Sequence, residues 1–497
     1  MSQSNIAMIG LGVMGKSLAL NLIDHGFDVS GFDINPVNRA HTTAEAALVS
    51  QQDHKGRFIA LTSLADLLAS LESPRVIALS VPAGEIVDNV INDLLKAGLT
   101  KQDIVIDTGN SLWTDSERRE KQYQGQLRFF STAVSGGEVG ARTGPSLMAS
   151  GDQSAWQYVK PMWLAIAAKV DSNGLAVGQF ESGEACAAYL GPAGAGHYVK
   201  MVHNGIEYAD MQLICEAYHF MTQALNLSAS EIGQIFAQWN QGVLNSYLME
   251  ISAEILQTSD PVTSKPLVEV VLDKAGQKGT GLWTAVNALQ AGVPAPTIAQ
   301  AVFARAQSGQ KALRVKAQKQ LSTQLQQGDL SDVGATLTAL HDALFCAKVT
   351  VYAQGFDLLK TTSCAEHWAL DYANIAKIWR AGCIIRAHFL QDITKAYQRD
   401  PELDNLLLAQ DFITQIETKS SGWRSTVAHA AMSGVPMPAI SSALSYFDSL
   451  RCGVLPANLL QAQRDYFGAH GYSRLDDAES NRYHLTWSDN EKRQILQ

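Results

Sequence analysis

The chain has 497 residues, of which 46% are apolar and 17% charged, and these proportions are typical of a folded globular protein rather than a disordered one. A net charge of −10 argues against non-specific nucleic-acid binding. No run of about 18 apolar residues offers a membrane span. The six scattered cysteines contain no CxxC pair, so we expect free thiols, no metal site and a cytoplasmic location.

The first predicted element is a dinucleotide cradle. We expect a buried strand over Asn5–Ile9, a helix over Lys16–His25 and a second strand over Phe27–Phe32 that ends at Asp33. The glycine-rich run between the first strand and the helix is Gly10, Leu11, Gly12, Val13, Met14 and Gly15. Such glycines let the backbone approach a pyrophosphate, and an acid about 20 residues later suits a ribose. A chance glycine-rich turn is the alternative, and the flanking strands disfavour it.

Three more predicted strands, residues 75–81, 104–107 and 129–134, continue the alternation. Alternating strands and helices predict a parallel, doubly wound sheet, so we assign residues 1–192 to an α/β Rossmann-type domain. Ligands of such sheets lie beyond the carboxyl ends of the strands. The candidate residues there are Val81, Pro82, Ala83, Asn110, Ser135, Gly136 and Gly137. Ordinary turn chemistry is the alternative for their glycines.

From residue 193 the strand signals stop, and we expect an all-helical domain over residues 193–452. Its first stretch, Gly194–Gln212, spaces five polar residues by three and four positions, which places them on one face of a helix. Together they could grip a polar substrate and move its protons. A solvated amphipathic helix is the commoner fate of such a mixture. The five residues are Lys200, His203, Asn204, Glu207 and Tyr208.

A second polar cluster lies in the glycine-rich turn Gln277–Gly281. Lys278 and the hydroxyl of Thr280 suit a phosphate there, and Arg305 could add a fork of donors. Each of the three, taken alone, is more commonly a surface residue or part of a structural ion pair.

The helical domain contains a weak internal repeat. The sequence Trp239-Asn240-Gln241-Gly242 recurs as Trp379-Arg380-Ala381-Gly382, and Trp283 recurs as Trp423 in the same register of 140 residues. Two similar helical halves are therefore predicted, with the polar helix in the first half only. Chance recurrence is the weaker interpretation, because two anchors share one register.

Residues 453–497 form a C-terminal tail. A short predicted helix carries Arg464 and His470 together with apolar Leu459, Leu460 and Phe467, which suggests that it docks on another surface. The composition does not choose between the same chain and a partner subunit.

These segments together closely resemble the decarboxylating 6-phosphogluconate dehydrogenases, over nearly the whole chain. The resemblance rests on GLGVMG (10–15), DTGNS (107–111), SGGEVGARTGPSLMAS (135–150), GAGHYVKMVHNGIEYADMQLICEAY (194–218), GQKGTG (276–281), VFAR (302–305), WRAGCIIRAHFL (379–390) and QAQRDYFGAH (461–470). It implies oxidative decarboxylation of 6-phospho-D-gluconate to ribulose 5-phosphate in the pentose phosphate pathway, with reduction of NAD(P) and no metal.

The resemblance also implies roles for the candidate residues. Lys200 resembles the base that takes the proton from the C3 hydroxyl, and Glu207 the acid that protonates the enediol after carbon dioxide leaves. Residues that match the positions holding the sugar acid are Asn110, Ser135, Gly136, Gly137, His203 and Asn204. Those that match its phosphate site are Tyr208, Lys278, Thr280 and Arg305. In the family, Arg464 and His470 arrive from the other subunit, which implies a homodimer whose tails complete the active sites.

The chain departs from the family in the coenzyme pocket. Members that use NADP, the family default, usually carry Asn-Arg-Thr after the second strand, whereas this chain has Asp33, Ile34 and Asn35. The carboxylate of Asp33 would accept hydrogen bonds from a free ribose hydroxyl and repel a 2′-phosphate, so we expect a preference for NAD. Arg39 is the nearby cation that could compensate. In the alternative interpretation, Asp33 only caps a turn.

Two other functions compete with this interpretation. One is a different 3-hydroxyacid dehydrogenase, although such chains are typically shorter and lack the phosphate residues. The other is a non-catalytic dinucleotide sensor, because a fold does not guarantee activity. A sensor has no reason to keep Lys200 and Glu207 beside a phosphate site.

Overall fold

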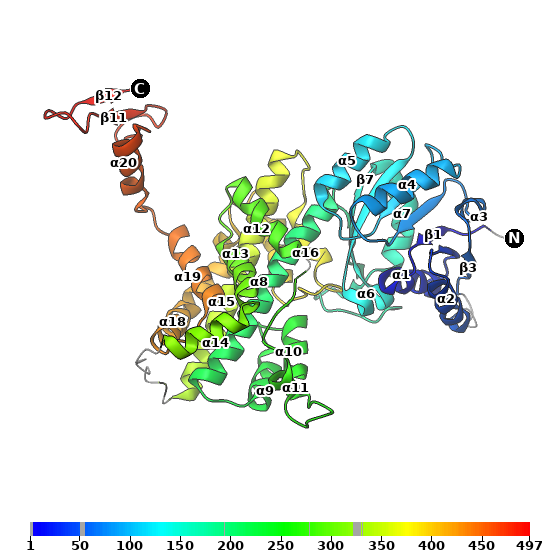
Figure 1. Ribbon diagram of the computed structural model, residues 1–497, viewed down its shortest axis with the longest axis horizontal. Helices are drawn as coiled ribbons and strands as arrows, with labels where there is room; N and C mark the ends of the chain where they lie inside the picture. Colours follow the sequence, from blue (N-terminus) through cyan, green and yellow to red (C-terminus); the bar gives the residue numbers. More distant parts are fainter. Residues whose placement is uncertain (1–2, 50–54, 193, 278, 322–329, 331) are drawn as a thin grey trace. The chain divides into compact units, whose positions relative to one another are not determined.

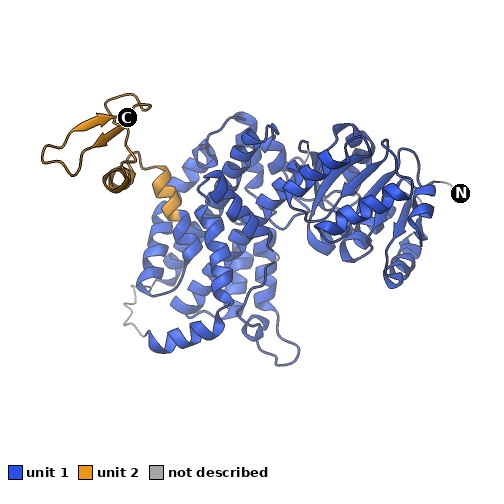
Figure 2. Cartoon of the chain, turned by 45° about the horizontal axis from the view of Figure 1, so that its top comes forward, with its two compact units in different colours: residues 1–443 blue, residues 444–497 orange. Residues whose placement is uncertain are grey.

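The computed structural model describes residues 3–49, 55–192, 194–277, 279–321, 330 and 332–497. It forms two compact units, Met1–Ala443 and Leu444–Gln497 (Figure 2). The first unit contains both the sheet and the large helical region, and the second contains the tail. None of the helices in the described part of the chain combines the length and apolar character that a membrane crossing needs.

The N-terminal part of the first unit is an eight-stranded sheet, coloured blue to cyan in Figure 1. Its spatial order is β10-β7-β6-β5-β4-β1-β2-β3. The central strands are runs of apolar residues and are buried on both faces, as is typical of parallel sheets. The strands are β1 (Ile6–Ile9), β2 (Val29–Phe32), β3 (Phe58–Leu61), β4 (Val76–Leu79), β5 (Ile104–Asp107), β6 (Arg128–Ser135), β7 (Ser146–Gly151) and β10 (Ala187–Tyr189).

The expected sheet is confirmed, with one correction. The strand β7 runs antiparallel to β6, although every other neighbouring pair is parallel. The connection between them, residues 136–145, is shorter than the dozen or so residues that a parallel crossover needs. Because β3, β7 and β10 are short or rich in small polar residues, the sequence pattern did not predict them.

Helices cover both faces of the sheet and bury separate cores. On one face, α1 and α7 pack Leu22 and Trp163 into a cluster with Ile106. On the other face, α4 contributes Ile91 and Leu94 to a second cluster. The helices of this region are α1 (Val13–Asp24), α2 (Pro36–Val49), α3 (Leu64–Ala69), α4 (Glu85–Lys96), α5 (Trp113–Tyr123), α6 (Gly137–Thr143) and α7 (Gln153–Ile166). A small ladder of β8 (Lys169–Val170) and β9 (Glu184–Ala185) follows them.

The rest of the first unit is helical, as expected, and its two halves correspond. At an offset of about 140 residues, α8 matches α15, α9 matches α16, α10 matches α17, and α12 and α13 match α18 and α19. The helices are α8 (Ala195–Ala224), α9 (Ala229–Trp239), α10 (Tyr247–Gln257), α11 (Leu267–Val270), α12 (Thr280–Ala291), α13 (Pro296–Ser308), α14 (Lys311–Gln320), α15 (Val333–Ala365), α16 (Tyr372–Ile378), α17 (Leu390–Arg399), the 3-10 helix η1 (Leu406–Leu408), α18 (Gln410–Met432) and α19 (Pro438–Leu450), whose last residues enter the second unit.

The second unit has its own hydrogen-bonded centre. It contains α20 (Ala457–Gly468) and a hairpin of β11 (Tyr483–Leu485) and β12 (Gln494–Leu496) that the sequence did not predict. Burial opposes ionisation of Asp465, but hydrogen bonds from His484, the Leu485 N–H and Trp487 lower its pKa to about 2. The tail is therefore a folded module with a buried anionic centre.

Candidate active site

The polar face predicted between Gly194 and Gln212 lies in α8, and it is buried rather than solvated. The solvent reaches 7% of Lys200 and Asn204 and none of His203. Helix α8 approaches the sheet closely because Gly196 leaves no room for a side chain: a Cβ there would lie 2.4 Å from the carbonyl oxygen of Met148 in β7. The surface-helix alternative is therefore wrong, and these side chains face the end of the sheet.

Three residues form a compact triangle. The Lys200 Nζ donates to Ser135 Oγ at 2.9 Å, and it lies 3.3 Å from His203 Nδ1. The other ring nitrogen of His203 lies 3.2 Å from Ser135 Oγ. Because Ser135 ends β6 and the other two lie on α8, the triangle joins the sheet to the helix.

Burial sets the protonation of this cluster. It lowers the pKa of Lys200, although the nearby carboxylate of Glu207 acts in the opposite direction. It also brings the pKa of His203 well below its usual value, and the positive charge of Lys200 adds to this effect. A lysine with a lowered pKa can act as a base near neutral pH.

Glu207 lies one turn beyond His203, with its carboxylate 3.8 Å from His203 Nδ1. Burial raises the pKa of Glu207 more than Lys200 and Arg305 lower it, and Asp210 raises it further. A carboxyl group with a raised pKa can hold a proton and donate it. The helix therefore presents a candidate base and a candidate acid on one face.

A cationic and polar cluster surrounds Tyr208, which lies one turn beyond Asn204 on α8. The guanidinium of Arg305 lies 3.5 Å from the ring centroid of Tyr208 and donates to the carbonyl oxygen of Gly276 at 3.3 Å. Thr280 is the first residue of α12, whose N-terminal N–H groups favour an anion. A Cβ on Gly281, the residue after Thr280, would lie 2.3 Å from the Tyr208 ring, so Tyr208, Thr280 and Arg305 are brought together, whereas Lys278 lies outside the described residues.

The expected coenzyme residues meet at the carboxyl end of the sheet. Gly10 has a φ of +90°, and a Cβ there would lie 2.3 Å from the Ser80 carbonyl oxygen. Gly12 caps α1 with no side-chain hydrogen bond and with open space beside it, so the helix N-terminus fits a pyrophosphate. The residues around this cradle come from the run Gly10 to Gly15, from Val81, Pro82 and Ala83 after β4, and from Asn110 after β5.

Asp33 is held in place by several hydrogen bonds. Its carboxylate accepts the backbone N–H groups of Leu11 and Asn35 and the amide of Asn38, at 2.7, 2.8 and 3.0 Å. These bonds keep the pKa of Asp33 below its usual value despite partial burial, so the group is an anion at neutral pH. The guanidinium of Arg39 donates to the backbone carbonyl of Asp33, so a cation also lies at this end of β2.

Two supporting groups were not predicted from the sequence. Arg119 is fully buried and donates to the Gly84 carbonyl oxygen, Asp88 and Asp107, so it supports the loops that follow β4 and β5. Trp379 packs its ring edge-to-face against His203, with centroids 5.6 Å apart. The repeated Trp-x-x-Gly motif contains Trp379 but does not indicate its contact with His203, and no local pattern pointed to Arg119.

Arg464 and His470 lie in the second unit, so their expected place in the site is not tested. Arg464 donates to Gln461 at 3.1 Å, and His470 packs against the ring of Phe467. Within the described ranges, no cluster of three or more His, Cys, Asp or Glu side chains could hold a metal ion.

Comparison with known proteins gives one consistent result. Residues 5–175 match the family described as the NAD binding domain of 6-phosphogluconate dehydrogenase, and residues 196–487 match its C-terminal domain. The chain is 49% identical to an NADP(+)-dependent, decarboxylating 6-phosphogluconate dehydrogenase of Bacillus subtilis, covering 98% of this chain and 100% of the relative. It is 46% identical to the decarboxylating enzyme of Candida albicans, covering 98% and 92%.

A solved structure agrees with these sequence matches. The Plasmodium falciparum 6-phosphogluconate dehydrogenase, studied in its apo form and with NADP+ or 6-phosphogluconate, superposes with a TM-score of 0.91 at 39% identity. The match covers 97% of this chain and 100% of the other.

Proposed function

The chain belongs to the family of decarboxylating 6-phosphogluconate dehydrogenases, and we propose that it oxidises 6-phospho-D-gluconate to ribulose 5-phosphate and carbon dioxide. The observation that carries this proposal is the buried cluster of Lys200, Ser135 and His203, with Glu207 one turn away. The cationic Arg305 and the helix N-terminus at Thr280 lie on the same side and suit the substrate phosphate. A cytoplasmic location stays part of this proposal.

In the first step, neutral Lys200 takes the proton of the C3 hydroxyl while the hydride of C3 leaves. The nicotinamide coenzyme supplies the hydride acceptor. Burial favours the neutral amine that this step needs, because it lowers the pKa of Lys200. His203 and Ser135 hold the amine of Lys200 and form hydrogen bonds with the sugar acid.

In the second step, the β-keto acid loses carbon dioxide. Lys200, now protonated, polarises the new carbonyl group and gives its proton to the C3 oxygen as the C1–C2 bond breaks, so the electrons of that bond form the C2=C3 double bond of an enediol. Glu207 then gives its proton to C2 of the gluconate skeleton, which becomes C1 of the product, while the hydroxyl on C3 returns its proton to Lys200, and the ketose product results. A raised pKa keeps Glu207 protonated until this step.

We further propose that NAD is preferred over NADP, although the Bacillus subtilis relative is named NADP(+)-dependent. The anionic Asp33 at the end of β2 supports this choice, because it would repel a 2′-phosphate. The exposed Ile34 stands where the family usually has an arginine. Arg39 acts in the opposite direction, but its guanidinium is already bonded to the Asp33 carbonyl.

We also propose a homodimer in which Arg464 and His470 complete the partner's site. The tail carries exposed apolar side chains on α20, which favour docking in an assembly. They are Leu459, Leu460, Tyr466 and Phe467, each more than half exposed. Measurement of mass in solution by light scattering tests the dimer directly.

Initial rates with 6-phosphogluconate, measured with NAD and with NADP, test the reaction. Reduced coenzyme and carbon dioxide should appear in equal amounts. Comparable turnover of non-phosphorylated 3-hydroxy acids would favour the rival dehydrogenase, and coenzyme binding without turnover would favour the sensor. Full activity of Lys200→Met would refute the assigned mechanism.

A further inference from the structure

The loop from Trp379 to Cys383, in the second helical half, forms a wall behind the candidate catalytic cluster. Trp379 and His203 are both inaccessible to solvent, and their rings meet edge-to-face at an interplanar angle of 78°. The Cys383 thiol donates to the Trp379 carbonyl oxygen at 3.0 Å and so closes the loop on itself. Because an edge-to-face contact has a preferred geometry, the Trp379 ring restricts the orientation of the imidazole.

The same loop supports the turn that follows β6. The carbonyl oxygen of Gly382 accepts the backbone N–H of Ser146 at 2.8 Å. A Cβ on Gly136 would lie 2.6 Å from that oxygen, so the two backbones touch. Gly382 has a φ of +67°, and a Cβ there would lie 2.5 Å from the Gly144 carbonyl oxygen. A shift of the loop would therefore move the Gly136 turn as well as the His203 ring.

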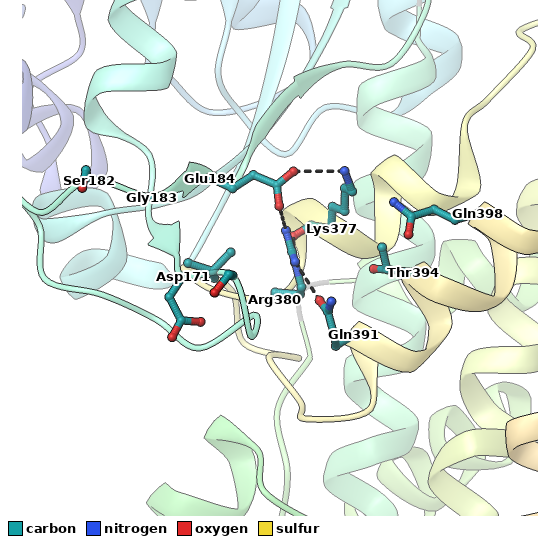
Figure 3. Close-up of a pocket in the computed structure, with 11 residues that line it drawn as sticks. Asp171, Ser182, Gly183, Glu184, Lys377, Arg380, Gln391, Thr394 and Gln398 are labelled. Carbon is teal, nitrogen blue, oxygen red and sulfur yellow. Dashed lines mark hydrogen bonds and ion pairs between the residues drawn. The ribbon is translucent and has the colours of Figure 1, made fainter.

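Arg380 holds this loop in place from its other side (Figure 3). Its side chain is 5% exposed and reaches three acceptors: Glu184 of β9, Gln391 of α17 at 2.7 Å, and the Lys377 carbonyl oxygen at 3.0 Å. Lys377 also binds Glu184, at 3.0 Å, which completes a clamp beside a cavity of about 480 Å³. The clamp ties the end of the nucleotide-binding region to the second helical half.

The first helical half provides an internal comparison. There Trp239 packs edge-to-face on His341 of α15, at 5.4 Å and 76°, although the position that corresponds to His203 in the repeat is Ala343. Asn240 stands at the position of Arg380, and its side chain accepts the backbone N–H of Ser246 instead. The loop of this repeat therefore forms without an arginine clamp.

We propose that Arg380, paired with Glu184, is a positioning residue for catalysis. Through the loop from Trp379 to Cys383, it holds the His203 ring and the Gly136 turn in the geometry that receives the sugar acid. This inference rests on the proposed function, because the sugar acid is the substrate named there. Arg380 does not touch the substrate, and it acts only through the residues that it orients.

The test is Arg380→Met, with Arg399→Met as a matched control. Arg399 lies on α17 in the same helical half and forms an exposed ion pair with Asp411. For Arg380→Met we expect kcat/KM for 6-phosphogluconate to fall by about 10- to 100-fold, with a lower kcat and a higher KM. Small misplacements of substrate-binding groups have effects of this size. The KM for the coenzyme should stay within about 2- to 3-fold, because its cradle lies elsewhere on the sheet. Arg399→Met should behave as the wild type.

Further variants separate positioning from folding. Arg380→Lys keeps a cation for Glu184 and should recover part of the lost activity. Glu184→Gln leaves Arg380 its other two acceptors, and so it provides a folded variant if Arg380→Met does not fold. If the pair acts as one unit, the double variant should be no worse than Arg380→Met. Unfolding temperatures are measured for all variants alongside the kinetics.

Three results are decisive. If Arg380→Met and Glu184→Gln unfold at lower temperature but keep wild-type kinetic constants, the clamp is only structural and the inference is overturned. Calorimetric binding of 6-phosphogluconate separates this from failure of the proposed function. A wild type that binds the compound without turning it over refutes the reaction, whereas weakened binding in Arg380→Met alone still supports the clamp. A wild type that neither binds nor reacts overturns both.

Discussion

The coenzyme preference can be changed at two neighbouring positions after β2, the buried Asp33 and the exposed Ile34. The double variant Asp33→Asn, Ile34→Arg removes the anion at the end of β2 and adds a guanidinium beside it. Ile34 is 90% exposed, so its replacement disturbs no packing. The amide that replaces the Asp33 carboxylate can accept only with its single carbonyl oxygen, so one of the bonds from Leu11 and Asn35 is lost. That loss should cost about 1 kcal/mol of stability.

The magnitude follows from two electrostatic effects. Repulsion between the Asp33 carboxylate and a 2′-phosphate at about 4 Å is worth roughly 1 kcal/mol in water and 4 kcal/mol at the effective dielectric constant of a protein surface. A charge-assisted hydrogen bond from the new arginine contributes about 1.5–3 kcal/mol more. Since 1.4 kcal/mol is about a tenfold effect, the ratio of kcat/KM for NADP over NAD should rise by at least about 100-fold.

Steady-state kinetics with both coenzymes at saturating 6-phosphogluconate provide the measurement. Val37→Arg is the matched control, because it adds the same charge at a half-exposed position of α2 without replacing Asp33. It should change the ratio much less than the double variant. A wild type that already prefers NADP, together with a double variant that leaves the ratio unchanged, would refute the argument. Arg39 would then be the residue that reads the phosphate.

Three other predictions concern the catalytic helix, its far end and the tail. Lys200→Met should lower kcat by at least about 100-fold with little change in coenzyme affinity, and Glu207→Gln should slow release of the decarboxylated product, both followed by stopped-flow absorbance. Burial raises the pKa of Glu216 from 4.5 to about 7, so its folded state binds more protons between these values. The wild type should therefore lose up to about 3 kcal/mol of stability as the pH rises from 4.5 to 7, and Glu216→Gln should abolish that slope in thermal unfolding. Removal of the residues after Leu455 should abolish turnover and dimerisation, measured by initial rates and light scattering.

The nucleotide cradle could be predicted from sequence because its determinants are local. Gly10 and Gly15 must lack side chains because a Cβ on Gly15 would lie 1.9 Å from the carbonyl oxygen of Gly10, and Asp33 must follow the next strand. The same holds for the face of α8, where helical spacing alone places Lys200 next to His203 and Glu207. Burial of that face could not be read from spacing, because a polar stripe is typical of a solvated helix.

The supports of the site could not be predicted, because they join segments far apart in the chain. Arg119 reaches Gly84 across 35 residues, and Arg380 reaches Glu184 across 196. An arginine on an amphipathic helix or in a loop has no local signature of such a contact. The antiparallel β7 was missed for a related reason: its direction depends on the length of the connection after β6, and strand residues carry no signal of direction.

The repeat explains how one helical half can carry the chemistry while the other supports it. At the offset of 140 residues, the first four candidate-site positions of α8 correspond to Leu340, Ala343, Leu344 and Ala347 on α15, and all four are buried. Apolar residues there make α15 a core helix against which α8 packs. The fifth position is Lys348, whose ammonium group binds Asp210 of α8 in a fully buried ion pair.

That ion pair matters more for the charge near Glu207 than for the stability of the fold. A buried pair roughly balances its desolvation cost, so an apolar pair of similar volume would pack α15 on α8 as well. The pair instead keeps a carboxylate three residues beyond Glu207, where its charge raises the pKa of Glu207. The second half thus contacts the helix of the candidate acid through Lys348, and in our proposal it supports the substrate-binding residues through the Arg380 loop, although it contains none of the candidate proton-transferring residues.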